Sequence, residues 1–264
     1  MEVSKADPCE EISKSSAYVR EWMARQPAVK EESLSDWLLY DISSRLPNVY
    51  YHAFNRVEEG RVTGADWEWW ILFPDQHIRM RVQAKKAFDD KDNYSEIART
   101  NKYGLQIDKL MQDAATVNAI PLYALFSSTG HASSCKFKQA HPDGVYLAGA
   151  EAIYNNYISG PRIRVEAADL ISDSIPFSCF ACCPLSYRGA DGAARFVETY
   201  FPQESEPNDS GHSPRGLHLQ LPAYVTSLLE FDPDDVPDWW EREFVSSTED
   251  FRALLVYDFR DRNV

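Results

Sequence analysis

Two apolar runs joined by a short turn constrain the fold of this chain more than any other feature. Residues 65–73 read ADWEWWILF, residues 77–88 read HIRMRVQAKKAF, and the tripeptide PDQ separates them. Polar and apolar side chains alternate in both runs, and the proline and aspartate between them mark a turn. Because successive side chains of a strand point to opposite faces, the pattern predicts two adjacent strands that share a polar patch.

Helices and further strands are expected on either side of this strand pair. Apolar periodicity predicts helices over residues 11–25, about 30–46, and 94–119 with a break near Gly104. The other expected strands are residues 49–57, which would complete a three-strand meander, and residues 120–128. Because the last of these follows a helix, we expect it to lie parallel to a neighbour. This order predicts an α/β or α+β fold with a central mixed sheet flanked by helices.

The second half of the chain gives weaker signals. Residues 144–158 indicate a strand followed by a helix, residues 202–216 a polar loop, and Asp238 the N-cap of an aromatic helix. The expected organisation is an N-terminal helical extension over residues 1–27, a core over 28–130, and an accessory region over 131–264 packed on that core.

Composition and charge limit the partners, the cellular location and the redox state that we expect. Its formal net charge is −14, which argues against coating nucleic acid by bulk electrostatics but leaves room for a local basic groove. No apolar run is long enough to span a bilayer and no apolar signal core begins the sequence, so we expect a cytoplasmic protein without a membrane partner. The five cysteines are odd in number and irregularly spaced, which favours reduced thiols.

Four polar side chains can meet on one face of the expected strand pair. Asp66 and Glu68 share a face of the first strand, and Gln83 and Lys85 share a face of the second. The alternative for Asp66 and Glu68 is the solvated face of a half-buried strand. Together, however, a carboxylate, an amide and a lysine make a compact polar site on an otherwise apolar sheet.

Such a site has the groups that metal-assisted phosphodiester hydrolysis needs. Asp66, the Gln83 side chain and the Ala84 carbonyl offer hard oxygen ligands for Mg²⁺. Lys85 would orient or help deprotonate the attacking water and offset charge on the phosphate. The sequence therefore predicts a metal site at this patch.

A glutamate of the second helix is expected to complete the site. On a helical wheel Glu31 lies near the centre of the apolar face that includes Leu34 and Leu38, where an unpaired carboxylate is costly. A metal ion is one way to satisfy it, and a favourable interaction with the helix dipole is another. Glu32 lies at the edge of that face and is the alternative ligand.

These motifs together resemble the PD-(D/E)xK nuclease superfamily. The chain has a helix with an inward Glu, then GADWEW and QAKK on successive strands, then a helix and PLYALF. It is similar to variants with a Q-x-K third motif, found in Mrr-like restriction endonucleases and in nuclease domains of bacterial anti-phage systems. It also resembles an uncharacterised bacterial family with EES-x-[ST]-D-W-L-L, GADWEWW and QAKK segments. The resemblance covers roughly residues 28–128.

The resemblance implies a restriction-endonuclease-like fold and assigns roles to particular positions. It places Asp66, Gln83 and Lys85 at the metal-ligand and catalytic positions, with Glu31 or Glu32 as the helix glutamate. Gln83 replaces the more usual acidic residue and lowers the negative charge of the site. Glu68, on the Asp66 face, is the carboxylate that would compensate as a further catalytic residue.

Four residues are expected to contact nucleic acid. Arg81 and Lys86 belong to a basic cluster on the second strand of the pair. Gln106 and Lys109 share a face of the next helix, which borders the active site in the families that the chain resembles. An ordinary solvated face is the alternative reading of that helix.

The resulting functional expectation is a Mg²⁺- or Mn²⁺-dependent nuclease that acts on DNA, with RNA as the alternative substrate. By resemblance, its role would be anti-phage defence. Cleavage of both strands would call for a homodimer. Because an ungated DNA nuclease harms its host, a gate is also expected, through a regulatory partner protein, a ligand or oligomerisation. The competing hypothesis is a catalytically inactive nuclease-fold module that binds nucleic acid or a partner protein.

Overall fold

The structure is a computed structural model that describes most of the chain. The described residues are 7–54, 64–74, 76–88, 92–101, 104–133, 135, 143–159, 165–183, 191–204, 215–231 and 252–260. The helix expected to begin at Asp238 lies outside these ranges, as does most of the loop expected over residues 202–216.

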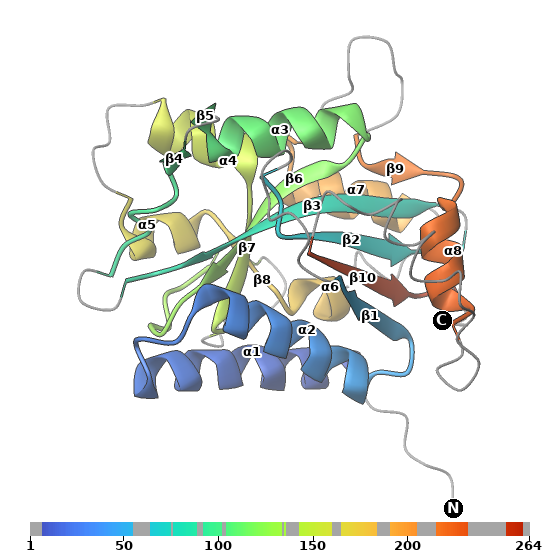
Figure 1. The fold of residues 1–264 in the computed structure, drawn as a ribbon, viewed down its shortest axis with the longest axis horizontal. Coiled ribbons are helices and arrows are strands. Elements are labelled where there is room, and N and C mark those ends of the chain that lie inside the picture. The colour runs from blue at the N-terminus through green and yellow to red at the C-terminus, as the bar shows by residue number, and fades with distance from the viewer. Residues whose placement is uncertain are drawn as a thin grey trace, which may run out of the picture.

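A mixed β-sheet forms the centre of the described part of the molecule (Figure 1). Its strands are β1 (Val49–Ala53), β2 (Trp67–Leu72), β3 (His77–Lys86), β6 (Ile120–Phe126), β7 (Val145–Gly149), β8 (Ile175–Pro176), β9 (Leu217–His218) and β10 (Ala253–Asp258). Their spatial order is β1-β10-β2-β3-β6-β7-β8, and β9 pairs with β3. A separate small hairpin joins β4 (Thr100–Asn101) to β5 (Gly104–Leu105). The α/β fold expected from the sequence is confirmed.

The strand pair expected from the two apolar runs is present. β2 and β3 are antiparallel, with Trp67 opposite Val82 and Glu68 opposite Arg81. β6 lies parallel to β3 on its other side, as a strand that enters through a helix should. These three strands place the segment that follows Gly64 beside the QAKK segment.

The expected three-strand meander is wrong, because β10 lies between β1 and β2. It pairs antiparallel with β1 and parallel with β2, so the last described strand of the chain occupies the middle of the sheet. Its sequence, ALLVYD, is buried almost throughout, as suits a strand covered on both faces. Residues 131–264 thus supply β7, β8, β9 and β10 to the central sheet itself, instead of only packing against it.

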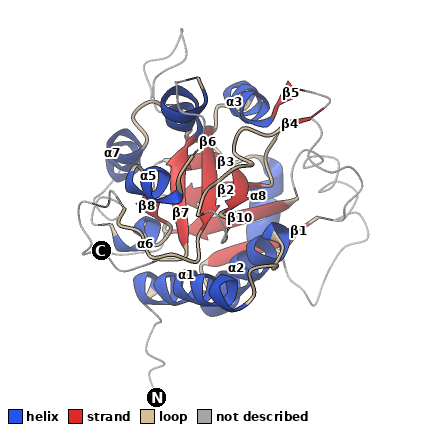
Figure 2. Ribbon diagram, turned by 90° about the vertical axis from the view of Figure 1, so that its left-hand side faces the viewer, coloured by secondary structure: helices blue, strands red, loops and turns tan. Residues whose placement is uncertain are grey.

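Helices cover both faces of the sheet (Figure 2). On one face lie α1 (Pro8–Arg25), α2 (Glu31–Arg45), α6 (Cys179–Cys182) and α7 (Asp191–Tyr200). On the other face lie α3 (Gln106–Thr116), α4 (Ala150–Ile153) with the π-helical turn η1 (Tyr154–Ile158), α5 (Ala167–Ser172) and α8 (Ala223–Leu229). No helix within the described ranges is long and apolar enough to cross a membrane.

The alternation in β2 divides its tryptophans between the two layers. Trp67 and Trp69 join the core beneath α1 and α2, whereas Trp70 packs with Val225 of α8 and Val256 of β10. All three indoles are at most 1% exposed, Glu68 between them is fully buried, and the Asp66 side chain keeps 18% exposure. The solvated strand face considered as an alternative for Asp66 and Glu68 is therefore not formed here.

The helix expected over residues 94–119 is only half formed. Residues 95–98 make turns and β4 and β5 follow, so that α3 begins at Gln106. Gly104 has a positive φ of 108°, a conformation that a helix does not contain and that favours glycine. The helical periodicity before this residue was therefore misleading, although the break expected near Gly104 is present.

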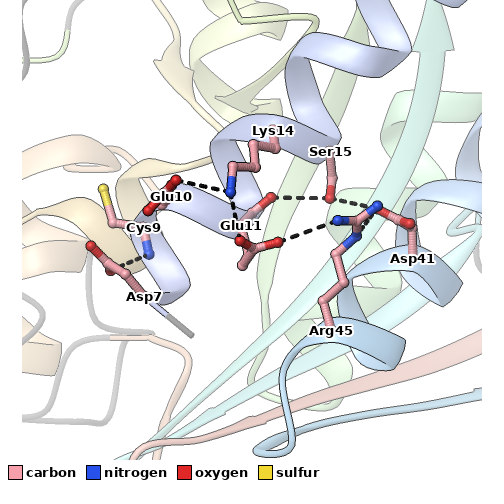
Figure 3. A network of polar contacts seen from close by, with 8 residues as sticks. All are labelled: Asp7, Cys9, Glu10, Glu11, Lys14, Ser15, Asp41 and Arg45. Carbon is pink, nitrogen blue, oxygen red and sulfur yellow. Dashed lines mark hydrogen bonds and ion pairs between the residues drawn. The ribbon is translucent and has the colours of Figure 1, made fainter. Parts of the chain in front are cut away.

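A network of polar contacts fixes α2 against α1 (Figure 3). Asp41 of α2 accepts a hydrogen bond of 2.7 Å from Ser15 and pairs with Arg45 at 2.9 Å. Arg45 also reaches Glu11 of α1 at 3.3 Å, and Glu11 pairs with Lys14 at 2.8 Å. This network holds in place the helix that carries Glu31 at its N-terminus.

The cysteines differ from expectation. Cys9 and Cys182 form a disulfide that joins the start of α1 to α6, so the prediction of reduced thiols is wrong for these two. The two residues are separated by 173 positions in the sequence and meet only because α1 packs on α6. Cys179 and Cys183 are buried thiols, and the Cys179 and Cys135 sulfur atoms lie 3.1 Å apart.

Candidate functional site

Asp66 lies at the bend that leads into β2 and is anchored to β3. Its backbone N–H donates to the Val82 carbonyl, and its Oδ2 accepts a 2.8 Å hydrogen bond from the Ala84 N–H. Oδ2 also accepts a hydrogen bond from Gln83 Nε2. The register that pairs Trp67 with Val82 therefore brings the first two residues of the expected site into contact.

The glycine of the GADWEWW segment permits a close approach to α3. Gly64 has a φ of 72°, and a Cβ atom at this position would lie 2.8 Å from the Gln106 carbonyl oxygen. Any larger residue would force the strand and the helix apart. Gly64 thus sets the distance between the Asp66 segment and the start of α3.

Gln83 connects Asp66 to α3. Its Nε2 contacts Asp66 and the Ala84 carbonyl oxygen, the latter at 3.1 Å, and its Oε1 accepts a 2.7 Å bond from Gln106 Nε2. The Oε1 atom of Gln106 is buried and has no hydrogen-bond partner. Of the residues expected on α3, Gln106 is therefore part of the site.

Glu31 enters the same place from the first turn of α2. Its Oε2 accepts a 2.8 Å hydrogen bond from the Lys86 N–H, and its Oε1 lies 3.9 Å from Lys85 Nζ. Lys85 is only 3% exposed, so this ammonium group is held inside the protein next to the carboxylate. Between the two glutamates left open by the sequence, Glu31 is the one that contacts β3.

The electrostatics of the two carboxyl groups differ from those of surface groups. Burial raises the pKa of Glu31 to about 7, an effect that Lys85 opposes and the charge of Asp66 reinforces. Burial likewise raises the pKa of Asp66, while Arg252 and Lys85 oppose the rise. The nearby positive charges do not fully offset the effect of burial on either carboxyl group. A divalent cation placed between the two would therefore stabilise both ionised forms.

Two hollows meet at these residues. A cavity of about 80 Å³ is lined by Glu31, Glu32, Asp66, Ala84 and Arg252 among others. A wider groove of about 620 Å³ also borders Glu31 and Glu32 and is flanked by residues 27–30, 86–88, Glu96 and Arg99. The carboxylates therefore stand where a small cavity adjoins a groove large enough for part of an extended substrate.

The oxygen ligands expected for a metal ion converge only when the side-chain amides of Gln83 and Gln106 are turned over. No cluster of three or more His, Cys, Asp or Glu side chains suited to a metal occurs among the described residues. Exchange of the amide oxygen and nitrogen in both Gln83 and Gln106 would preserve their mutual hydrogen bond. It would also direct Gln83 Oε1 toward Asp66 and the Ala84 carbonyl. Carboxylate, amide and carbonyl oxygens are ligands suited to Mg²⁺, so the residues present fit this ion.

Comparison with known proteins identifies a family for nearly the whole chain. The model of DUF6615, a family of unknown function, matches residues 8–257. The chain belongs to the DUF6615 family. Searches of curated proteins and of solved structures found no match. Because the DUF6615 match runs from α1 into β10, it includes every residue of the candidate site.

Glu68 lies apart from this site, in a closed cluster of charges. It is fully buried and accepts hydrogen bonds from Trp70 Nε1 at 2.6 Å, from Arg79 Nε at 2.9 Å and from the Tyr224 hydroxyl. Arg81 Nε lies 3.3 Å from the same carboxylate. All its partners are internal, so the structure gives Glu68 no access to the two hollows beside Asp66.

The residues expected to contact nucleic acid are also divided. Arg81 is 3% exposed and pairs with Glu68 and with Asp113 at 3.1 Å, so its guanidinium group is withdrawn from solvent. Lys86 borders the groove, but its Nζ donates to the Val29 and Pro27 carbonyl oxygens. It therefore holds the segment between α1 and α2, a role that the sequence did not suggest.

The two remaining predicted residues lie at the edges of the site. Glu32 is 43% exposed and its Oε1 stands 3.9 Å from Arg252 NH1. Lys109 lies on α3, where its Cβ would be 3.3 Å from a Cβ built on Gly64. Arg252 itself was missed by sequence reasoning, because nothing near it in the sequence indicates that β10 enters the sheet beside Asp66.

Proposed function

We propose that this DUF6615 protein is a metal-dependent nuclease of the PD-(D/E)xK type. The observation that carries the proposal is that Asp66 and Glu31 line one cavity, while Gln83 contacts Asp66 and the buried ammonium group of Lys85 lies 3.9 Å from Glu31. Carboxylates with raised pKa values near a cation, placed in a hollow, are typical of catalytic sites. The order of the motifs along the chain supports the same reaction class.

In this proposal each residue has a distinct task. Asp66, Glu31 and the oxygen atoms of Gln83 and Ala84 would hold Mg²⁺ or Mn²⁺, which supplies Lewis acidity at a phosphodiester oxygen. Lys85 orients the attacking water and stabilises negative charge that develops on the phosphate. Gln106 fixes the Gln83 amide through its 2.7 Å hydrogen bond. Glu68 and Arg81 have no catalytic task and stabilise the sheet.

Nucleic acid is the substrate class that we propose, with DNA ahead of RNA. Lys30 and Arg99 flank the groove beside Glu31 and can receive a phosphate backbone, although the chain as a whole carries a net charge of −14. A role in bacterial anti-phage defence, in a homodimer or under a regulatory partner, belongs to the same proposal.

A second candidate function is a binding module without catalysis. The hydrogen bond from Gln83 Nε2 to Asp66 favours it, because in this amide orientation the site is closed without any metal ion. A nucleic acid or a protein partner would then occupy the groove, and the charged residues would serve only as contacts.

The test is a cleavage assay with the full-length chain and Lys85→Ala. Both would be incubated with supercoiled, linear and single-stranded DNA and with RNA, in Mg²⁺, Mn²⁺ or EDTA. We expect metal-dependent cleavage by the wild type and a loss of at least about 10²-fold in the variant, because one charge-stabilising group is removed. Arg25→Ala, which removes an exposed cation from the last turn of α1, serves as the control and should cleave like the wild type.

The outcome separates the two functions. Cleavage that persists unchanged in Lys85→Ala would exclude this site as its source. If folded wild type cleaves none of the substrates with either metal, yet binds one of them, the binding module replaces the nuclease as the preferred function.

A further inference from the structure

Arg252 is fixed beside Asp66 by the backbone of three strands. Its N–H donates a 2.8 Å hydrogen bond to the Asp66 carbonyl, and its own carbonyl accepts one of 2.8 Å from the Phe54 N–H. It directly precedes β10, at the end where β10 meets β1 and β2. The backbone that carries the guanidinium group is therefore part of the hydrogen-bond network at this end of the sheet.

The guanidinium group is close to two carboxylates but pairs tightly with neither. Its Nε lies 3.9 Å from Asp66 Oδ1, and its NH1 lies 3.9 Å from Glu32 Oε1. Both distances exceed those of hydrogen bonds. The Nε atom is buried without a hydrogen-bond partner, although the side chain lines the 80 Å³ cavity. The Nε–H group of Arg252 is thus a hydrogen-bond donor without an acceptor inside the candidate site.

Arg79 shows the contact geometry of an arginine that neutralises a buried carboxylate in this protein. Arg79 NH2 lies 2.8 Å from Glu68 Oε2 and its Nε donates to the same atom at 2.9 Å. If Arg252 served only to neutralise Asp66, similar contacts would be expected. Its longer distances and its unpartnered Nε leave donors of the guanidinium group available to an anionic oxygen that enters the cavity.

We infer that Arg252 binds a non-bridging oxygen of the phosphodiester that is cleaved at Asp66. The guanidinium group offers several donors in one plane and suits a phosphate better than an ammonium group does. In naming the ligand as a phosphodiester, the inference rests on the proposed function. It adds a phosphate contact from the far end of the sequence, on the opposite side of Asp66 from β3.

The experiment compares Arg252→Ala, Arg252→Gln and Arg252→Lys with the wild type. kcat and KM are measured on the DNA or RNA that the wild type cleaves best. Binding of fluorescein-labelled DNA and RNA oligonucleotides is followed by anisotropy in Ca²⁺ and in EDTA, whether or not the wild type cleaves them. Arg260→Ala is the control, because Arg260 follows the same strand but pairs with Asp258 at 2.6 Å. Thermal unfolding establishes that each variant is folded.

We expect kcat/KM to fall by about 10²-fold in Arg252→Ala and Arg252→Gln, the usual effect of removing one donor to developing charge. Arg252→Lys should fall between these variants and the wild type, because charge is retained without the planar set of donors. The control should stay within about twofold of the wild type. If Arg252→Ala does not fold, the Lys and Gln variants carry the test by the same comparison.

Two results separate this inference from the proposed function. Cleavage by the wild type together with unchanged kcat and KM in the Arg252 variants overturns the inference and leaves the nuclease in place. If the wild type does not cleave, anisotropy decides. Weaker oligonucleotide binding by Arg252→Ala and Arg252→Gln supports the phosphate contact without the nuclease, whereas equal binding, or no binding by any protein, overturns both.

Discussion

Asp66 and Glu68 stand two residues apart in the GADWEWW segment, yet they occupy contrasting surroundings. Glu68 is fully buried, with arginine nitrogens at 2.8 Å and 3.3 Å. Asp66 is bound by an amide and a backbone N–H, and its nearest guanidinium nitrogen is 3.9 Å away. It also borders a cavity that Glu68 does not reach. The sequence pattern predicted one shared site for both side chains.

The difference teaches how a structural carboxylate can be told from a candidate functional one. A buried charge with close cationic partners is already neutralised, and its role is to stabilise the fold. A carboxylate with a raised pKa, loosely placed cations and a neighbouring hollow is left with an unmet demand for positive charge. By this criterion the Asp66 region can bind a cationic ligand, whereas the Glu68 carboxylate is already neutralised and has no capacity to bind one.

The largest effect should come from Asp66→Asn. We expect metal-dependent cleavage to fall by at least about 10³-fold, about 4 kcal/mol of transition-state stabilisation, because a charged metal ligand is lost. The unfolding free energy should stay the same or rise, since asparagine can still accept from the Ala84 N–H without a buried charge. Cleavage assays and urea unfolding measure the two quantities. Asp169→Asn, an exposed carboxylate on α5, is the control and should keep full activity.

Glu68→Gln should show the opposite pattern. The substitution leaves Arg79 and Arg81 buried without their counter-ion, so we expect the unfolding free energy to drop by about 3–5 kcal/mol. Urea unfolding gives that value. In the folded fraction, cleavage per molecule should match the wild type. A stable but inactive Glu68→Gln protein would contradict the division between the two regions and return Glu68 to the catalytic site.

A smaller effect is expected from pH. The folded-state pKa of Glu31, about 7, lies above its ordinary value of 4.5. As pH rises through this window the unfolded chain releases the proton first, so the unfolding free energy should fall between about pH 4.5 and 7 and level off above. The Glu31 side chain is 27% exposed, and the total change should be on the order of 1–3 kcal/mol.

Urea unfolding at several pH values tests this expectation by comparing the wild type with Glu31→Gln. The difference between their stabilities should grow across the window in favour of the glutamine variant. Glu21→Gln, an exposed glutamate on α1, should follow the wild type. Parallel curves for the wild type and Glu31→Gln would show that Glu31 is as well compensated as Glu68.

The sequence predicted the contacts that follow from strand alternation and from helical periodicity. Strand alternation placed β2 beside β3, and this register alone brings Asp66 to Gln83. Helical periodicity likewise turned Glu31 toward the sheet. These contacts join segments that are close in the sequence or that are oriented by their own amphipathic pattern.

The remaining features depend on contacts between distant segments. The position of β10, and with it Arg252, follows from pairing with β1 and β2 about two hundred residues earlier, which no short pattern reveals. The Cys9–Cys182 disulfide has the same origin. Glu68 was misassigned for another reason, because Tyr224 of α8 and the two arginines that close around it become neighbours only in the folded chain.

The central place of β10 also sets the time at which the candidate site can be completed. While the chain is being synthesised, Asp66, Gln83 and Lys85 emerge long before residues 252–258, and until then nothing separates β1 from β2 or supplies Arg252. Strand pairing over such a distance is slow, and domains fold as units once their chain is available. Assembly of the site is therefore one of the last events in the maturation of the protein, and chains shortened before β10 would carry the GADWEWW and QAKK motifs without a complete site.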